Sequence, residues 1–207
     1  MSITNTISQK IRQLDAGAFQ KLCDAIIKKE YAGQFVSYGS HADSNKTTKG
    51  TPDSYIALPS EEYIFIEYTT QSNNLVDKIK ADIQKCLDTK TTNVPVEKIV
   101  EIIYCHTSTN ISPGHDLKLK KMCEDHGITL TIFGIDQIAE KLYRSHREIA
   151  QDHLGIPFGT NQIMEYQQFI QHYDANALAA PLCTDFQFRK KEIESIDSAY
   201  TSGNVVI

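Results

Sequence analysis

The chain has 207 residues, 41% of them hydrophobic, which is enough for one α/β domain with a sizeable core or for one domain and an appendage. A net charge of −5 and a pI near 5.8 do not indicate a nucleic-acid-binding protein, although an acidic chain can carry a local basic patch. The chain has no apolar run near the roughly 20 residues that span a bilayer and no signal-peptide pattern, and its five scattered cysteines favour a reduced, cytoplasmic protein without a membrane partner.

Hydrophobic periodicity predicts alternating helices and strands along the first 150 residues or so. The expected elements are two helical stripes between residues 2 and 30, a strand at 34–38, a polar loop at 39–50, a hairpin of strands at 54–58 and 62–69, a helix at 75–87, a strand at 98–105, a helix at 116–126, a strand at 128–133 and a helix at 135–149. The hairpin makes an antiparallel start, and the strand–helix–strand units after it favour parallel pairing. We therefore expect an α/β fold with a mixed sheet flanked by helices.

Two acidic residues stand at the ends of the hairpin strands. If the turn centres near residues 59–62, the numbers of cross-strand partners sum to about 120 or 121, so Asp53 lies opposite Glu67 or Tyr68. Carboxylates that close repel each other unless a cation lies between them, and Mg²⁺ accepts carboxylate and water oxygens. The pair therefore predicts a metal site, and the alternative is a solvated acidic pair on a half-exposed hairpin.

These residues resemble the motif of the PD-(D/E)xK nuclease superfamily. Asp53 follows a proline, and thirteen residues separate it from Glu67-Tyr68-Thr69, where that family has a Glu-x-Lys. The resemblance covers about residues 10–150 and implies a restriction-endonuclease-like core of the order αβββαβ. It also implies Mg²⁺- or Mn²⁺-dependent hydrolysis of double-stranded DNA, with Asp53 and Glu67 binding the metal. In this family an upstream helix often carries a Glu or Gln near the metal-bound water. Gln20 is the candidate here, and the alternative is an ordinary surface glutamine.

The sequence departs from that family at Thr69, which replaces the lysine of the Glu-x-Lys motif. That lysine activates the attacking water and stabilises charge on the phosphate. In some members it has moved to another element, and the helix after the hairpin offers Lys78, the preferred candidate, and Lys80. The loop residue Lys49 comes after them. Each of these lysines can also be read as part of a solvated surface. If none reaches the acids, the domain binds without cutting.

The C-terminal tail resembles the segment that precedes the phosphate-binding loop of STAND and AAA-like ATPases. A basic helical stretch at 186–193 is followed by a Gly-Asn turn and by Val205-Val206-Ile207, which look like the start of a strand. We expect a nuclease domain at 1–154, and a linker and the beginning of an ATPase domain at 155–207, in a chain cut from a longer protein. The alternative is a native C-terminal edge strand.

Taken together, these resemblances imply the effector nuclease domain of a bacterial antiviral ATPase. Oligomerisation through further C-terminal domains would activate it. Two alternatives remain, namely a catalytically inactive nuclease fold that binds DNA or protein, and a stand-alone restriction-type endonuclease. The histidines show no metal-ligand spacing, and apart from the loop residue His41, which could touch substrate, we interpret them as structural or surface residues.

Overall fold

The computed structural model describes residues 2–37, 51–109, 111–158 and 194. Contacts divide the chain into two units, Met1–Phe158 and Gly159–Ile207, and the helices and strands named below belong to the first. The expected polar loop, with His41 and Lys49, lies outside the described residues, as does the ATPase-like tail apart from Glu194. The boundary near residue 154 and the linker assignment therefore stay predictions.

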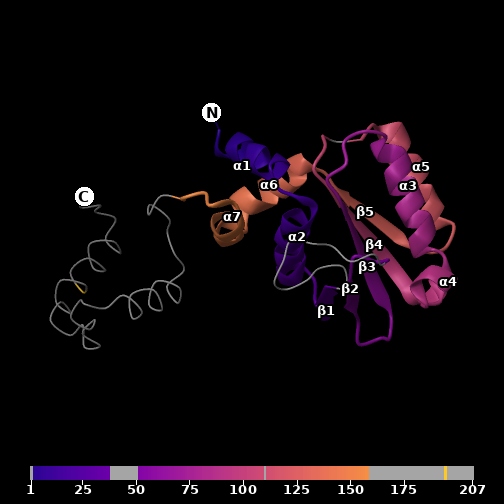
Figure 1. Cartoon of the computed structure of the whole chain (residues 1–207). Coiled ribbons are helices and arrows are strands. Elements are labelled where there is room, and N and C mark those ends of the chain that lie inside the picture. Colours follow the sequence, from indigo (N-terminus) through magenta and orange to yellow (C-terminus); the bar gives the residue numbers. More distant parts are fainter. Residues whose placement is uncertain (1, 38–50, 110, 159–193, 195–207) are drawn as a thin grey trace. The chain divides into compact units, whose positions relative to one another are not determined.

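Five strands form one mixed sheet in the order β1-β2-β3-β4-β5 (Figure 1). They are β1 (Gln34–Ser37), β2 (Ser54–Ala57), β3 (Tyr63–Thr69), β4 (Ile99–His106) and β5 (Thr129–Phe133). β1 pairs with β2 and β2 with β3 in antiparallel fashion, whereas β3, β4 and β5 run parallel. The predicted antiparallel start and parallel continuation are confirmed, because a tight turn joins β2 to β3 while helices connect the parallel strands.

Seven helices accompany the sheet, counted over the residues that the structure describes. They are α1 (Ile3–Arg12), α2 (Ala16–Glu30), α3 (Leu75–Cys86), α4 (Thr89–Thr92), α5 (Pro113–Glu124), α6 (Ile135–Arg144) and α7 (Arg147–Leu154), and a 3₁₀ turn, η1 (Val96–Lys98), precedes β4. The two N-terminal stripes form separate helices because Asp15 caps α2. Its carboxylate accepts a hydrogen bond from the Ala18 N–H at 2.8 Å, which satisfies one of the free N–H groups of the first turn.

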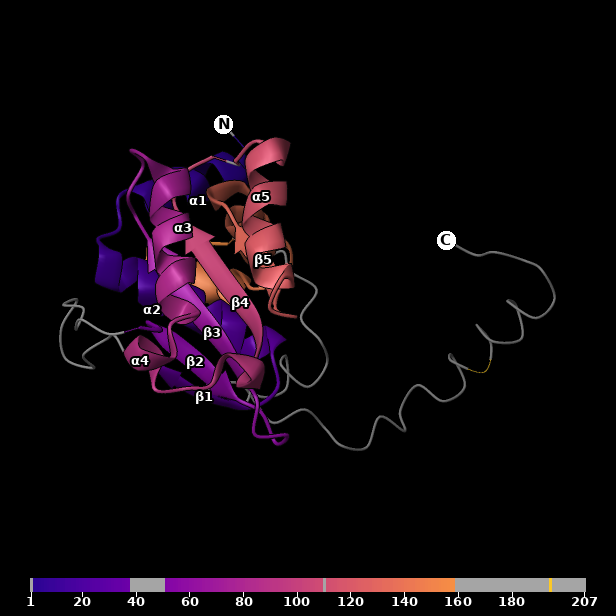
Figure 2. The ribbon, with the colours of Figure 1, turned by 90° about the vertical axis from the view of Figure 1, so that its right-hand side faces the viewer.

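Helices cover both faces of the sheet. α3 and α5 lie over one face, and α1 and α2 lie behind the other (Figure 2). Alternation along β3 sends Ile66 and Tyr68 into a core shared with α1, α2, α6 and α7, and sends Phe65 into a core shared with α3 and α5. Because both faces are buried, the central strands are almost continuously apolar, and an acid such as Glu67 stands out in them.

The predicted helix at 135–149 is interrupted in the structure. α6 ends at Arg144 and α7 begins at Arg147. His146 leaves helical geometry between them, with φ −134° and ψ 49°, and its Nε2 lies 3.0 Å from Oε1 of Glu30 at the end of α2. A contact with a distant helix therefore breaks the helix, and local periodicity does not encode it.

The start of α5 also differs from the prediction, which placed it at Asp116. The helix begins at Pro113, directly after the N-cap residue Ser112. Proline favours the first helical position because its fixed φ suits the helix and its missing N–H would have no partner there. The Ser-Pro pair was the available signal for this earlier start.

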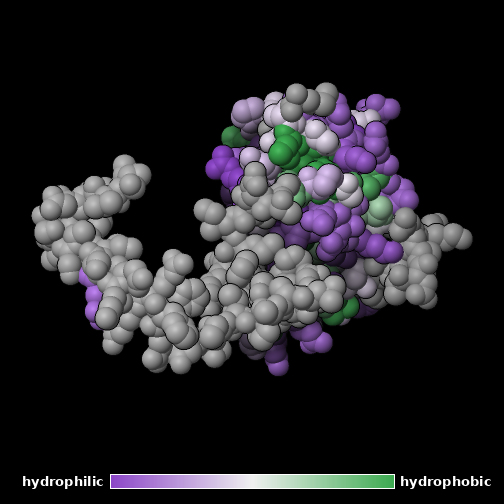
Figure 3. All heavy atoms as spheres, turned by 90° about the vertical axis from the view of Figure 1, so that its left-hand side faces the viewer, coloured by the Kyte–Doolittle hydropathy of each residue, from purple (hydrophilic) through white to green (hydrophobic). Residues whose placement is uncertain are grey.

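The described surface is largely hydrophilic. Figure 3 shows the face toward α1 and α7, where hydrophilic residues surround a small hydrophobic group. Within the described ranges, the exposed large hydrophobic side chains are Ile3 on α1 and Leu117 on α5. A search of the same residues finds no helix with the length and apolar character needed to cross a membrane.

Candidate metal centre

The hairpin brings Asp53 and Glu67 together. Ser54 pairs with Ile66 and Tyr55 with Phe65, so partner numbers sum to 120, and one further step along the register places Asp53 opposite Glu67. The Tyr68 N–H donates a hydrogen bond to Oδ2 of Asp53 at 3.1 Å. This bond holds the Asp53 carboxyl against the end of β3, beside the side chain that precedes Tyr68.

The carboxyl groups of Asp53 and Glu67 interact with each other, and the pKa of each is raised. Glu67 is only 5% exposed, and burial raises its pKa well above the usual range, with further increases from the charges of Asp53 and Asp82. Burial also raises the pKa of Asp53, although the Tyr68 N–H and the hydrogen bond with Glu67 partly oppose this. The thiol of Cys86 donates to Oε1 of Glu67 at 3.4 Å, a weak donor for a buried carboxylate. Ionisation of both carboxyls together is therefore unfavourable.

A third acid, Asp82 of α3, lies beside the pair and is held by cations. Its carboxylate accepts hydrogen bonds from Lys78 Nζ at 2.8 Å, from Lys85 Nζ at 3.0 Å and from the Tyr104 hydroxyl at 2.8 Å. Burial alone would raise the pKa of Asp82, but these bonds outweigh it and lower the pKa. Asp82 is therefore ionised, and its negative charge raises the pKa of Asp53 and of Glu67.

A divalent cation would relieve this arrangement. A cation bound by Asp53 and Glu67 would compete with protons for the two carboxylates and remove the repulsion between them. Within the described residues no group of three or more His, Cys, Asp or Glu side chains has the arrangement of a metal site, so the protein offers two carboxylate ligands. That donor set suits Mg²⁺ or Mn²⁺, since Mg²⁺ keeps several waters and binds through one or two carboxylates. It does not suit zinc, which prefers Cys and His ligands.

The candidate lysines lie in different places. Lys78 binds Asp82, and its charge lowers the pKa of Asp53, so it lies near the acids. Lys80 is exposed, about 200° further around α3, on a side that does not face Asp82. Lys85 was not predicted, yet it binds Asp82 and interacts electrostatically with Glu67. Thr69 is buried and its hydroxyl accepts a hydrogen bond from the Gln71 N–H at 3.2 Å, so it shapes the turn after β3 and supplies no charge.

Gln20 of α2 is 1% exposed, so it is not the surface residue of the alternative reading. Its Nε2 donates to the carbonyl of Asp53 and to the Ser54 hydroxyl, both at 3.3 Å. Gln20 therefore holds the backbone at the start of β2 from the face of the sheet opposite to the acids. It fixes where Asp53 stands, through the main chain of that residue.

One turn further along α2, Asp24 extends this support, and sequence analysis missed it. Its carboxylate accepts hydrogen bonds from Ser37 at 2.9 Å, from Ser54 at 3.0 Å and from the Tyr68 hydroxyl. These three donors come from β1, β2 and β3. Asp24 thus ties the antiparallel strands together on the face where Tyr68 points, while Asp53 and Glu67 face α3.

The missed acids carry a signal in the sequence. Asp24 lies four residues after Gln20, within the apolar stripe of α2. Asp82 likewise falls on the stripe of α3, three residues after Ile79, with lysines four residues before it and three residues after it. A charged residue at a core-facing helical position needs a buried partner, and that rule would have identified both acids.

Comparison of the chain with protein-family models finds no match, and comparison with curated protein sequences finds no relative.

Proposed function

We propose that the chain contains a metal-dependent nuclease domain that hydrolyses phosphodiester bonds in double-stranded DNA. One observation carries the proposal: Asp53 and Glu67 meet at the end of a hairpin, where burial raises the pKa of both, beside two lysines that bind Asp82. The order α2-β1-β2-β3-α3-β4 supports a restriction-endonuclease-like core. A metal held by the two carboxylates would polarise the phosphate and lower the pKa of an attacking water.

Other side chains would orient Asp53 and supply positive charge. Gln20 and the Tyr68 N–H fix Asp53, so its carboxylate is oriented before substrate arrives. Lys78 and Lys85 supply the positive charge that the Thr69 position lacks. A preorganised cation beside the developing charge of a phosphoryl transition state is worth more than the same charge in water. Asp82 holds both ammonium groups near the carboxylate pair.

We further propose that this domain is the effector of a larger antiviral protein and acts when several copies are clustered. The acidic net charge of the chain supports this idea, because non-specific affinity for DNA grows with each phosphate that a protein neutralises. Several copies on one oligomer would engage a duplex together and gain affinity without new contacts. The resemblance of the tail to the start of an ATPase domain supports the same assignment.

The second candidate is a nuclease fold that binds DNA or protein without cutting. The specific observation in its favour is that Lys78 and Lys85 both bind Asp82, which neutralises much of their charge. Cleavage assays separate the two candidates.

The decisive experiment compares plasmid cleavage by the wild-type chain and by Asp53→Ala, at high protein concentration with Mn²⁺ or Mg²⁺. We expect wild-type cleavage that EDTA abolishes and no measurable cleavage by the variant, because the variant loses one of two metal ligands. Asp53→Ala should melt close to the wild-type temperature, since it removes a repelled acid. Asp77→Ala removes an exposed acid of α3 and is the matched control that should cleave normally. Equal cleavage by Asp53→Ala and the wild type would refute the nuclease assignment.

A second experiment tests the lysines. Lys78→Ala should lower the cleavage rate by roughly 10²-fold, the size of effect seen when one charge-stabilising donor is lost. Lys85→Ala tests the other cation, and Lys80→Ala is the control on the exposed side of α3. If Lys78→Ala and Lys85→Ala both cleave at the wild-type rate, the site takes its cation from elsewhere or works through metal alone.

A further inference from the structure

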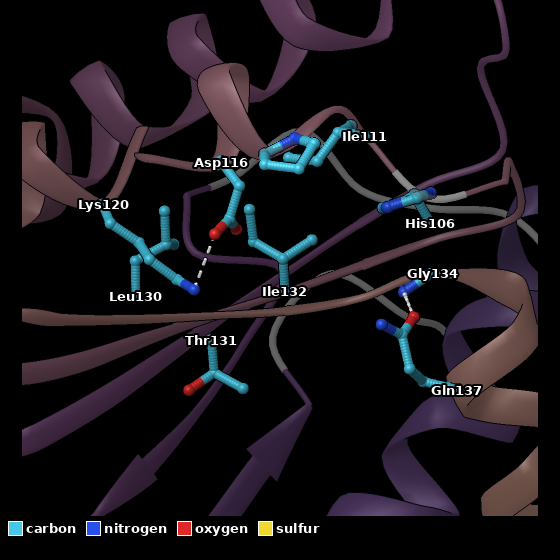
Figure 4. Close-up of a pocket in the computed structure, with 10 residues that line it drawn as sticks. His106, Ile111, Asp116, Lys120, Leu130, Thr131, Ile132, Gly134 and Gln137 are labelled. Atoms are coloured by element: carbon cyan, nitrogen blue, oxygen red, sulfur yellow. Dashed lines mark hydrogen bonds and ion pairs between the residues drawn. The ribbon is translucent and has the colours of Figure 1, made fainter. Parts of the chain in front are cut away.

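A pocket of about 480 Å³ lies along β5 and at the end of β4, beside α5 and the first turn of α6 (Figure 4). This size falls within the range of small-molecule sites. Three apolar side chains form much of its wall, Ile111, Leu130 and Ile132, and its polar lining includes His106, Asp116 and Gln137. Ligands of open α/β sheets bind at the carboxyl ends of parallel strands, and this pocket reaches the carboxyl end of β4 at His106.

His106 is the feature that calls for a ligand. The ring is 1% exposed at the last position of β4, and its Nδ1 has no hydrogen-bond partner among the residues that the structure describes. Burial lowers the pKa of His106, and the Ser108 backbone partly opposes this effect. A buried polar atom without a partner is costly and rare in folded proteins. Figure 4 shows the ring edge-on at one side of the pocket, between Ile111 and Gly134 in this view.

The other polar groups of the wall are already balanced. Lys120 Nζ lies 2.8 Å from Oδ2 of Asp116, and Oε1 of Gln137 accepts a hydrogen bond from the Gly134 N–H at 2.7 Å. The pocket therefore has no excess charge to attract a small anion or cation. A purely apolar ligand would leave His106 without a partner. A neutral, flat heterocycle with donors and acceptors along its edge suits both the apolar walls and the polar groups.

The pocket lies close to the acidic pair. Along the parallel pairing of β3 and β4, Glu67 stands opposite Tyr104 and Thr69 stands opposite His106. Alternation places Glu67, Tyr104 and His106 on the same face of the sheet. One strand spacing and two residues along a strand separate the Cα atoms of Glu67 and His106 by about 8 Å. A nucleotide whose phosphate approaches the acids could therefore direct its base toward the pocket.

The geometry points to this pocket as a binding site for a nucleobase, which would pair with the buried His106 ring and stack against the apolar walls. The choice of a nucleobase rests on the proposed nuclease function. Two sources share this chemistry: a base of the DNA strand turned out of its stack, and the base of a free nucleotide. Extruding a base costs a few kcal/mol and is a known route to reading it.

The test measures binding in EDTA, so that it does not depend on cleavage. Two fluorescent probes are titrated with the 207-residue chain: 2-aminopurine deoxyribonucleoside monophosphate, and a DNA oligonucleotide with one 2-aminopurine. His106→Phe removes the ring nitrogens and leaves a somewhat larger aromatic ring, and Ile111→Trp fills the pocket while residue 106 remains a histidine. His126→Phe changes an exposed histidine outside the pocket and is the matched control. Circular dichroism melts identify any variant that does not fold.

We expect at least one probe to bind the wild type and the control equally, and each folded pocket variant to lose about 10-fold or more in affinity, the cost of one unmade buried hydrogen bond. Binding of the mononucleotide alone identifies a free nucleotide as ligand, and binding of the oligonucleotide alone identifies a base of the strand. Failure of both probes to bind, or unchanged affinity in the folded variants, overturns the pocket proposal. Asp53-dependent cleavage would stand in that case, and pocket binding without such cleavage would refute only the nuclease.

Discussion

Two buried acids, Asp24 of α2 and Glu67 of β3, lie on opposite faces of the hairpin and have different neighbours. Burial raises the pKa of both. Asp24 accepts hydrogen bonds from three hydroxyls, whereas Glu67 has one thiol donor and another acid beside it. The hydroxyls satisfy the first carboxylate, and the second must keep a proton or gain a cation.

This difference separates structural burial of an acid from functional burial. A buried carboxylate with a full set of donors stabilises the strands that supply them. A buried carboxylate next to a second one is unfavourable in the free protein, and such an arrangement persists where a ligand uses it. The α2 face of the hairpin therefore carries the supporting hydrogen bonds, and the α3 face carries the metal site that we propose.

Mn²⁺ affinity should show the largest contrast between the two acids. Glu67→Gln keeps the shape of the side chain but removes a metal ligand. Loss of an outer-shell partner already costs up to about 100-fold in metal affinity, so we expect the dissociation constant for Mn²⁺ to rise by at least that factor. Asp24→Asn should change it by less than about 3-fold. Calorimetric titration of both variants at neutral pH provides the measurement. Equal losses of Mn²⁺ affinity in the two variants would mean that metal binding is not confined to the α3 face of the hairpin.

Unfolding should show the reverse contrast. Asp24→Ala leaves the hydroxyls of Ser37, Ser54 and Tyr68 without their shared acceptor, and we expect it to lower the free energy of unfolding by about 2 kcal/mol. Urea unfolding checks this value, with Glu67→Gln as the variant that should lose no stability. An Asp24→Ala variant as stable as the wild type would show that water replaces the carboxylate.

The pH dependence of stability should show the smallest contrast. Since the pKa of Glu67 is raised in the folded state, folded protein holds a proton that the unfolded chain has released. The stabilisation is complete below the ordinary Glu pKa and is lost as pH rises through the raised one, at up to about 1.4 kcal/mol per pH unit. Urea unfolding in EDTA across that interval should give a shallower slope for Glu67→Gln than for the wild type. Identical slopes would place the titration elsewhere.

Much of the fold could be predicted from the sequence because both cores impose regular patterns. The alternation in β3 and the helical stripes of α2 and α3 fix which side chains are buried. The hairpin turn fixes the register, and with it the meeting of Asp53 and Glu67. The break between α6 and α7 could not be predicted, because His146 leaves the helix for a partner on a helix more than a hundred residues earlier.

The supporting side chains of the site were harder to predict for a related reason. A lysine on a helix is equally compatible with solvent and with a buried acid, so periodicity does not distinguish Lys78 from Lys80, and the preference for Lys78 rests on its place near the start of the helix. Asp82 distinguishes the two lysines, because it binds Lys78 and so marks the side of α3 that faces the acids. His106 shows the same limit, because an unsatisfied ring nitrogen becomes visible only when its neighbours are known.

The position of the acids along the chain has a consequence for how the site assembles during folding. Asp53, Glu67, Lys78, Asp82 and Lys85 belong to one continuous stretch of chain, from the start of β2 to the end of α3. Bringing them together closes short loops, whose entropy cost is small, and contacts of this local kind favour fast folding. Gln20, Asp24 and Tyr104 come from farther away in the chain. The repelling acids are thus placed by local structure, and the distant helix then fixes the backbone beneath them.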